Sequence, residues 1–261
     1  MYSLFRLSPP APEKRSRVQR DSVALVLADG RRIDVLRVRD PRARRIRLSV
    51  GERGARLTLP PRASLVAGDR FLHEHRDWLA EQLLAIDGGV APPVRGEPSH
   101  LPLRDARLPV RWSDGRFACA RLDEGAIEIQ SPAHAGPAAI ARALRDFYEA
   151  QARADVGRWL PAYLPGLPRP PSRIRLRAMS SQWGSLAPDG TLALDLSLVL
   201  GPSSAFEYVL VHELCHLIRP DHSRAFWREV EARCPDWRDA RDYFHAHGRR
   251  LKADLHALLS A

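Results

Sequence analysis

The sequence predicts an α+β fold, in which amino-terminal antiparallel strands and a helix pack with a carboxy-terminal helical region. Short segments with an apolar residue at every second position fill much of the first half, as in half-buried strands. Long segments with apolar residues three and four positions apart dominate the second half, which indicates amphipathic helices. Strands and helices do not alternate regularly, so a βαβ architecture is not expected. The 261 residues suffice for one large domain or two small ones.

The amino-terminal strands are expected to be short and antiparallel, with a turn at Asp29-Gly30 between the first two. Their apolar residues alternate in the runs 23–27, 33–35, 46–50 and 57–59. Residues 64–86 change to helical spacing and form the one helix of this part of the chain. Weaker strands are expected at 108–112, 117–122 and 126–129.

The rest of the chain is expected to be mainly helical. A long amphipathic helix at 137–163 precedes a proline-rich linker at 165–171. Two strands, 173–179 and 191–196, flank a loop, and three helices follow at 204–218, 223–233 and 236–259. The chain therefore divides into a disordered basic tail (1–21), a β-rich region with one helix (22–135) and a mainly helical region (136–261).

Composition narrows the class of protein. No segment approaches eighteen consecutive apolar residues, so no membrane span or membrane partner is expected. Three widely spaced cysteines do not form a disulfide framework and favour a reducing compartment. The net charge is +10, and residues 1–47 hold 13 basic residues against five acidic ones. Such a segment can bind a nucleic acid or a nucleotide, or it can simply be a solvated surface.

The most informative segment carries H-E-x-x-H, formed by His212, Glu213 and His216. On a helix, residues four positions apart lie about 40° apart around the axis and about 6 Å along it, so both imidazoles can bind one metal ion. Glu213 lies on the adjacent side, where it can hold a metal-bound water and accept its proton. Cys215 is expected to point away from the metal as a small core residue.

A catalytic zinc ion takes three protein ligands and leaves one position for water, so a third ligand is needed. His222 is the first candidate, because Pro220 ends the helix and the chain can turn back toward the ion. Glu207 and Glu229 are alternative third ligands. Candidate proton donors are Tyr208, Tyr243 and one of His245 and His247.

Four segments occur together in a specific order along the chain. They are RARRIRLSV (42–50) before a helix containing DWL (77–79), SSQWGS (180–185), HELCHLIRPDH (212–222) followed by FW, and PDW (235–237). In this combination, over roughly residues 23–245, the chain resembles the YgjP-like metallopeptidase domain family. That family is related to the SprT-like proteins and to compact zincins with H-E-x-x-H-x5-H.

The resemblance implies that residues 136–261 are a zincin-like catalytic region. It implies one Zn²⁺ per chain held by His212, His216 and His222, with Glu213 as the catalytic base that activates a water. Three imidazoles also accept other divalent first-row ions. The implied substrate is a peptide or protein, and the implied location is the cytoplasm of a bacterium.

In related zincins, an extended substrate pairs with a strand beside the active-site helix. Residues 173–179 or 191–196 can do this by strand addition, with main-chain hydrogen bonds giving affinity. The chain departs from the family pattern at Leu186, where a cysteine is usual, and at Asp195, where an asparagine is usual. Neither is expected to be a metal ligand. Four residues of this region are candidates for substrate binding: Arg177, Ser181, Trp183 and Gly184.

Other functions are compatible with the same motif. One is a metal-dependent hydrolase of a nucleotide or phosphoanhydride, and another is a protease tethered to DNA through the basic amino-terminal segment. A third is a non-catalytic binding module stabilised by zinc. The third is disfavoured by Glu213, because a structural site needs only the ligands.

Overall fold

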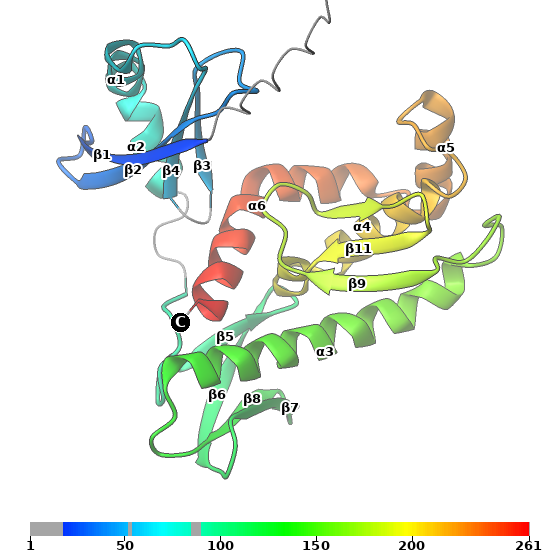
Figure 1. The fold of residues 1–261 in the computed structure, drawn as a ribbon. Coiled ribbons are helices and arrows are strands. Elements are labelled where there is room, and N and C mark those ends of the chain that lie inside the picture. The colour runs from blue at the N-terminus through cyan, green and yellow to red at the C-terminus, as the bar shows by residue number, and fades with distance from the viewer. Residues whose placement is uncertain (1–17, 52–53, 85–89, 261) are drawn as a thin grey trace, which may run out of the picture. The chain divides into compact units, whose positions relative to one another are not determined.

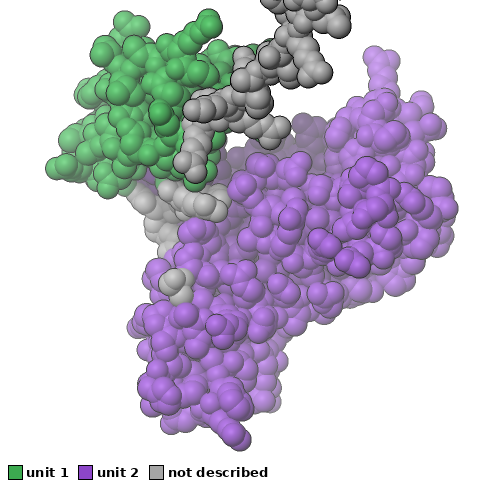
Figure 2. All heavy atoms as spheres, viewed as in Figure 1, with its two compact units in different colours: residues 1–50, 54–82 green, residues 51–53, 83–261 purple. Residues whose placement is uncertain are grey.

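The structure, a computed structural model of the chain, describes residues 18–51, 54–84 and 90–260. It separates into two compact units, residues 1–50 with 54–82 and residues 51–53 with 83–261, which are coloured separately in Figure 2. Both sheets and helices are present, strands dominate the first part and helices the second, and the α+β class is confirmed. None of the described helices has the length and apolar character that crossing a membrane requires.

The first unit is a four-stranded sheet with two helices. Its strands are β1 (Gln19–Val26), β2 (Arg32–Arg39), β3 (Arg47–Gly51) and β4 (Gly54–Leu59), in the order β1-β2-β4-β3. β1 and β2 form the expected antiparallel hairpin, whereas β2 and β4 are parallel. Most of the tail expected at 1–21 lies outside the described residues. Residues 19–21 already belong to β1, because Asp21 lies opposite Arg37 and forms an ion pair with it.

The helix expected at 64–86 is two helices, α1 (Leu65–Glu74) and α2 (Arg76–Leu84). The break lies at His75, whose φ of −109° and ψ of 15° are not helical. The His75 ring Nδ1 lies 2.9 Å from the Phe71 carbonyl, which holds the ring at the break. Gly68 lets α1 approach β4 closely, because a Cβ there would lie 3.0 Å from the Leu59 side chain.

The second unit contains two sheets joined by a long helix. The first sheet has β5 (His100–Leu103), β6 (Ala106–Asp114), β7 (Cys119–Asp123) and β8 (Ala126–Ser131), in the order β5-β6-β8-β7. Helix α3 (Pro137–Tyr163) contacts β7 of this sheet and β9 of the other, as Figure 1 shows. The boundary expected at 135/136 therefore falls inside this unit. β5 was not expected, because Pro98 and Pro102 argue against a strand and leave only Leu101 and Leu103 as an alternating apolar pattern.

The second sheet and the last helices surround the H-E-x-x-H segment. The sheet has β9 (Arg173–Arg177), β10 (Gly184–Leu186) and β11 (Thr191–Asp195), and a short 3₁₀ helix η1 (Leu196–Leu200) follows. The helices are α4 (Ser203–Cys215), α5 (Arg224–Arg233) and α6 (Trp237–Leu259). α4 ends at Cys215 rather than at 218. The N–H groups of residues 216–218 donate to the carbonyl three residues earlier, which is the pattern of a 3₁₀ turn rather than of an α-helix.

Candidate metal centre

Helix α4 carries the H-E-x-x-H residues through the core of the second unit. It contacts α3, α5, α6 and the β10-β11 edge of the sheet. Most of its surface is apolar and buried, including Val209, Leu210, Leu214 and Cys215. Cys215 is fully buried and lies outside the histidine cluster, as expected for a core residue. Tertiary packing therefore holds the helix, and one short face remains for polar side chains.

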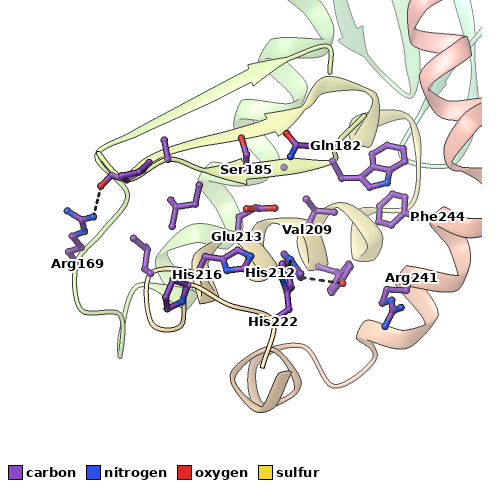
Figure 3. A pocket seen from close by; sticks show the side chains of 18 of the residues that line it. Arg169, Gln182, Ser185, Val209, His212, Glu213, His216, His222, Arg241 and Phe244 are labelled. Carbon is purple, nitrogen blue, oxygen red and sulfur yellow. Dashed lines mark hydrogen bonds between the residues drawn. The ribbon is translucent and has the colours of Figure 1, made fainter. Parts of the chain in front are cut away.

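The structure brings His212, His216 and His222 together. One nitrogen from each ring lies within 4.8 Å of those of the other two. The ring centroids of His212 and His216 are 5.1 Å apart, as expected for residues one helical turn apart. His222 Nε2 lies 3.2 Å from His212 Nε2, although the two residues are ten positions apart in the chain. Figure 3 shows the three rings converging on one region of the cleft.

Hydrogen bonds and packing orient these rings. His216 Nδ1 lies 3.1 Å from the Arg219 carbonyl, which only accepts, so Nδ1 carries the proton and Nε2 keeps a free lone pair. His212 Nδ1 lies 3.5 Å from the Tyr208 hydroxyl. Phe226, fully buried on α5, contacts all three rings and stacks on His216 with centroids 4.5 Å apart. The rings are therefore positioned by residues around them.

The loop from 219 to 223 places His222. Pro220 follows the end of α4 and prevents its continuation. The Asp221 carboxylate accepts a bond from the Ser223 N–H, and the Ser223 hydroxyl caps α5 by accepting from the Phe226 N–H. These two local bonds fix the turn that returns His222 toward α4.

Burial keeps the inner histidines neutral. It lowers the pKa of His212 to about 4, with further lowering from the neighbouring His216, His222 and Arg241. Burial also lowers the pKa of His216 below its usual range. Neutral imidazole is the form that binds metal ions, so His212 and His216 are in their metal-binding state at neutral pH.

The donor set fits a tetrahedral divalent ion. Zinc binds imidazole nitrogen at about 2.05 Å, so two ligands of a tetrahedral ion lie about 3.3 Å apart. The 3.2 Å between the Nε2 atoms of His212 and His222 matches that separation. Three imidazole ligands would leave the fourth position open for water, as in catalytic rather than structural sites.

Glu213 is buried beside this cluster, with 7% of its surface exposed. Burial raises the pKa of its carboxyl to about 7, which makes the group a stronger base than an exposed glutamate. Gly184 of β10 lies against it. A Cβ added at Gly184 would be 2.6 Å from the Glu213 Cγ and 2.7 Å from its Oε1. Only glycine leaves room for this carboxylate.

A cleft of about 860 Å³ opens in front of the histidines. Figure 3 shows Arg169 at one end, Arg241 and Phe244 at the other, and the three histidines between them. β10, the two residues before it and the two after it, residues 182–188, form one wall. This volume lies within the range of ligand-binding clefts and can hold a short extended peptide segment.

β10 is the edge strand that faces the cleft, which corrects the expected sites of strand addition. The sheet order is β10-β11-β9, so β11 (expected as 191–196) is paired on both sides and has no free edge. β9, within the expected 173–179, is the far edge and does not line the cleft. β10 was expected as a loop. The signal for it was the turn at Pro188-Asp189-Gly190, which folds residues 184–186 back onto 192–194.

The four candidate substrate-binding residues separate into two pairs. Trp183 and Gly184 line the cleft, whereas Arg177 and Ser181 are exposed and lie outside its lining. Trp183 also packs, because it stacks on Phe244 with ring centroids 4.5 Å apart. The contribution of these residues to substrate binding stays a prediction.

The two departures from the family pattern have different surroundings. Leu186 lines the cleft at the end of β10. Asp195 is 1% exposed and forms an ion pair with Lys252, with 3.0 Å between Oδ2 and Nζ. The Lys252 ammonium also donates to the carbonyls of Met179 and Gln182. An aspartate at 195 thus supplies a negative charge to this half-buried lysine, and the pair holds the loop before β10.

The alternative third ligands lie elsewhere. Glu207 accepts a hydrogen bond of 2.8 Å from the Tyr163 hydroxyl, and Glu229 pairs with Arg233 at 2.6 Å. Neither joins the cluster of His212, His216 and His222, among the described residues. Of the candidate proton donors, Tyr208 and His245 line the cleft. The Tyr243 hydroxyl instead faces Asp105 at 3.5 Å.

Comparison with known proteins identifies the family of the chain. The family model described as YgjP-like, metallopeptidase domain, matches residues 44–247, which include the whole histidine cluster and Glu213. A solved structure, the metallopeptidase zymogen of Pyrococcus abyssi abylysin, is 25% identical over 38% of this chain and 94% of that chain, with a TM-score of 0.27. No curated protein matches the chain.

Proposed function

Because the chain belongs to the YgjP-like metallopeptidase domain family, we propose that it is a zinc-dependent peptidase in which His212, His216 and His222 hold the metal and Glu213 is the general base. The family itself implies a metal and a peptide or protein substrate. One observation supports the finer assignment: three imidazole nitrogens converge within 4.8 Å beside a buried carboxylate.

Bound zinc would polarise the scissile carbonyl and acidify a water molecule. Glu213 would take the proton of the attacking water at its carboxylate and later deliver it to the leaving amine. A carboxyl pKa near neutrality suits both transfers, because the group must accept and release a proton in one cycle. Tyr208 and His245 line the same cleft as candidate hydrogen-bond donors to the substrate carbonyl.

The substrate would bind as an additional strand on β10. Among the described strands, β10 pairs with β11 alone, so its other edge can pair with an extended peptide through regular main-chain hydrogen bonds. This mode recognises the backbone, so affinity is not restricted to one sequence. Specificity would then come from side chains along the cleft.

Elemental analysis tests the metal assignment. The wild-type protein should contain about one zinc per chain, and His222→Ala should lose it or bind it far more weakly. Glu213→Gln should keep the zinc and lose turnover of β-casein, an unfolded protein substrate, by several orders of magnitude. Full turnover by this variant would refute the general-base role.

A nucleic-acid contact of the first unit is a second proposal, supported by a small groove on its surface. Arg45, Arg47, Phe71, His75 and Trp78 line this groove, which combines guanidinium groups with aromatic rings. Binding of single-stranded DNA that weakens steeply with salt, and that Arg45→Gln with Arg47→Gln reduces, would support it. Salt-independent binding or none would count against it. A cytoplasmic location is likewise proposed, on the three free cysteines.

A further inference from the structure

The charges that line the cleft are unbalanced. Among its lining residues, Arg169 and Arg241 carry guanidinium groups, while Glu213 is the one carboxylate. Glu213 is buried and assigned to the chemical step, so it does not neutralise the arginines at the two ends. A substrate with a negative group near either end would gain an ion pair that a neutral substrate lacks.

Arg241 is the arginine that is free to bind such a group. Arg169 donates a hydrogen bond of 3.2 Å to the Pro188 carbonyl. Arg241 has no hydrogen bond or ion pair with any residue that the structure describes. Its guanidinium instead lies over two indole rings, 5.5 Å from the centroid of Trp227 and 5.3 Å from that of Trp237.

The indole platform fixes the position of this guanidinium. Trp227 and Trp237 are stacked, with centroids 4.5 Å apart and an angle of 25° between the planes. Trp237 is 7% exposed, so the platform is anchored in the core. A cation over aromatic faces keeps its outward N–H groups available for a carboxylate, and it loses less side-chain entropy on binding.

Arg238, on the same helix, provides a comparison for Arg241. Its guanidinium also lies over Trp237, 4.4 Å from the centroid, but it pairs with Glu231 at 2.9 Å and does not line the cleft. Among the described residues, one of the two arginines on this ring thus has a carboxylate partner and the other has none. The unpaired one is the one that faces the cleft.

The direction of β10 indicates which end of a peptide would meet Arg241. Trp183, just before β10, stacks on Phe244, which lies one turn after Arg241 on α6. Arg169 is bonded to Pro188, just after β10. A peptide antiparallel to β10, the more stable pairing, therefore has its carboxy-terminal part at the Arg241 end. The Trp227 ring under this guanidinium also lies beside the metal centre, with its centroid 5.7 Å from that of His212 and 6.0 Å from that of His222.

We propose that Arg241 determines specificity by binding a carboxylate of the peptide on the carboxy-terminal side of the cleaved bond. The carboxylate is either an aspartate or glutamate side chain or the terminal carboxylate of the peptide. This inference rests on the peptidase function and strand addition to β10 proposed above. It adds a preference that the metal centre and the backbone pairing do not provide.

A random peptide library tests the proposal even though the natural substrate is unidentified. The full-length zinc-loaded protein is incubated with random octapeptides, half with free and half with amidated carboxy termini, and the cleavage sites are read by mass spectrometry. Wild type should favour glutamate over glutamine, or free over amidated ends, by about fivefold on the carboxy-terminal side, the upper range for an exposed ion pair. Comparison of the two halves distinguishes the two sources of the carboxylate.

Variants at two positions distinguish a specific contact of Arg241 from a general effect of the positive charge on α6. Arg241→Gln should abolish the preference, and Arg241→Glu should invert it toward lysine at the same subsite. Arg238→Gln is the matched control, because it removes an arginine from the same helix and the same indole ring outside the cleft. Identical cleavage profiles for wild type and Arg241→Gln would overturn the proposal, as would loss of the preference in Arg238→Gln.

A binding measurement separates this proposal from the peptidase function. Labelled, amidated octapeptide pools with glutamate or glutamine fixed in the carboxy-terminal half are titrated into Glu213→Gln, and fluorescence anisotropy is measured. The Glu213→Gln variant should bind the glutamate pool more tightly than the glutamine pool, and the double variant Glu213→Gln/Arg241→Gln should bind both equally. This result supports the carboxylate site even when wild type cleaves nothing. Equal affinity for the two pools, together with equal affinity for glutamine pools with free and with amidated carboxy termini, overturns it, even when wild type is an active peptidase.

Discussion

Replacing Gly184 by alanine perturbs the proposed general base through a single methyl group. The backbone of Gly184 is not in the left-handed region, so alanine is compatible with it. The added Cβ would nevertheless lie 2.6 Å from the Glu213 Cγ, 2.7 Å from Oε1 and 2.9 Å from Cδ. Because β10 is held by β11 in the sheet, we expect the glutamate side chain to move rather than the strand.

The size of that movement sets the expected loss of activity. Ordinary contacts of a Cβ begin at 3.4 Å, so Glu213 must retreat by about 3.4 − 2.6 = 0.8 Å. A misplacement of about 1 Å in a catalytic group costs on the order of 100-fold in rate. We therefore expect kcat on β-casein to fall about 100-fold, which corresponds to about 2.7 kcal/mol of transition-state stabilisation. KM should change much less, because the main-chain edge of β10 is retained.

Three measurements make this reasoning refutable. Zinc content should stay at about one per chain, since the three histidine ligands are untouched. Gly157→Ala is the matched glycine control, because a Cβ there meets nothing within 4 Å, and its kcat should equal that of wild type. Glu213→Asp, whose side chain is one methylene shorter, should cost less kcat in the Gly184→Ala background than in wild type. Wild-type kcat in Gly184→Ala would refute the close-contact argument.

The remaining predictions concern stability. Lys252→Met should lower the free energy of unfolding by about 3 kcal/mol in urea titrations, because it leaves Asp195 buried without its cation, and adding Asp195→Asn should recover part of this loss. Gly157→Ala should raise the free energy of unfolding by about 0.5–1 kcal/mol, since it lies exposed within α3. Zinc at about 1,000 times its Kd should stabilise wild type by about 4 kcal/mol in thermal scans, and His222→Ala should abolish the gain.

Local patterns in the sequence predicted the parts of the fold that depend on local geometry. The long helix at 137–163 is α3 with the same bounds, because its helical periodicity is strong and glycine and proline lie at its start. The prediction of a single helix at 64–86 was wrong. The break at His75 could not be predicted, because no glycine or proline marks it in the sequence. β10 was missed because three residues are too few to show alternation, and only the pairing with β11 makes them a strand.

The family membership and the convergence of the histidines were accessible from the sequence alone. Residues at i and i+4 of a helix must lie on one face, and Pro220 lies soon after His216 and stops the helix, so the spacing already indicated a shared site. Burial of these rings by Phe226 and the resulting neutral state required the packing of α5 on α4.

Only the tertiary structure decided what surrounds the site. The contact of Gly184 with Glu213 joins residues 29 positions apart, and Arg241 lines the cleft because Phe244, one turn later on α6, stacks on Trp183 just before β10. No regular spacing of residues in the sequence indicates either of these relations. The physical reason is that helix geometry relates neighbours in the chain, whereas burial, steric exclusion and charge pairing act between whichever residues the fold brings together.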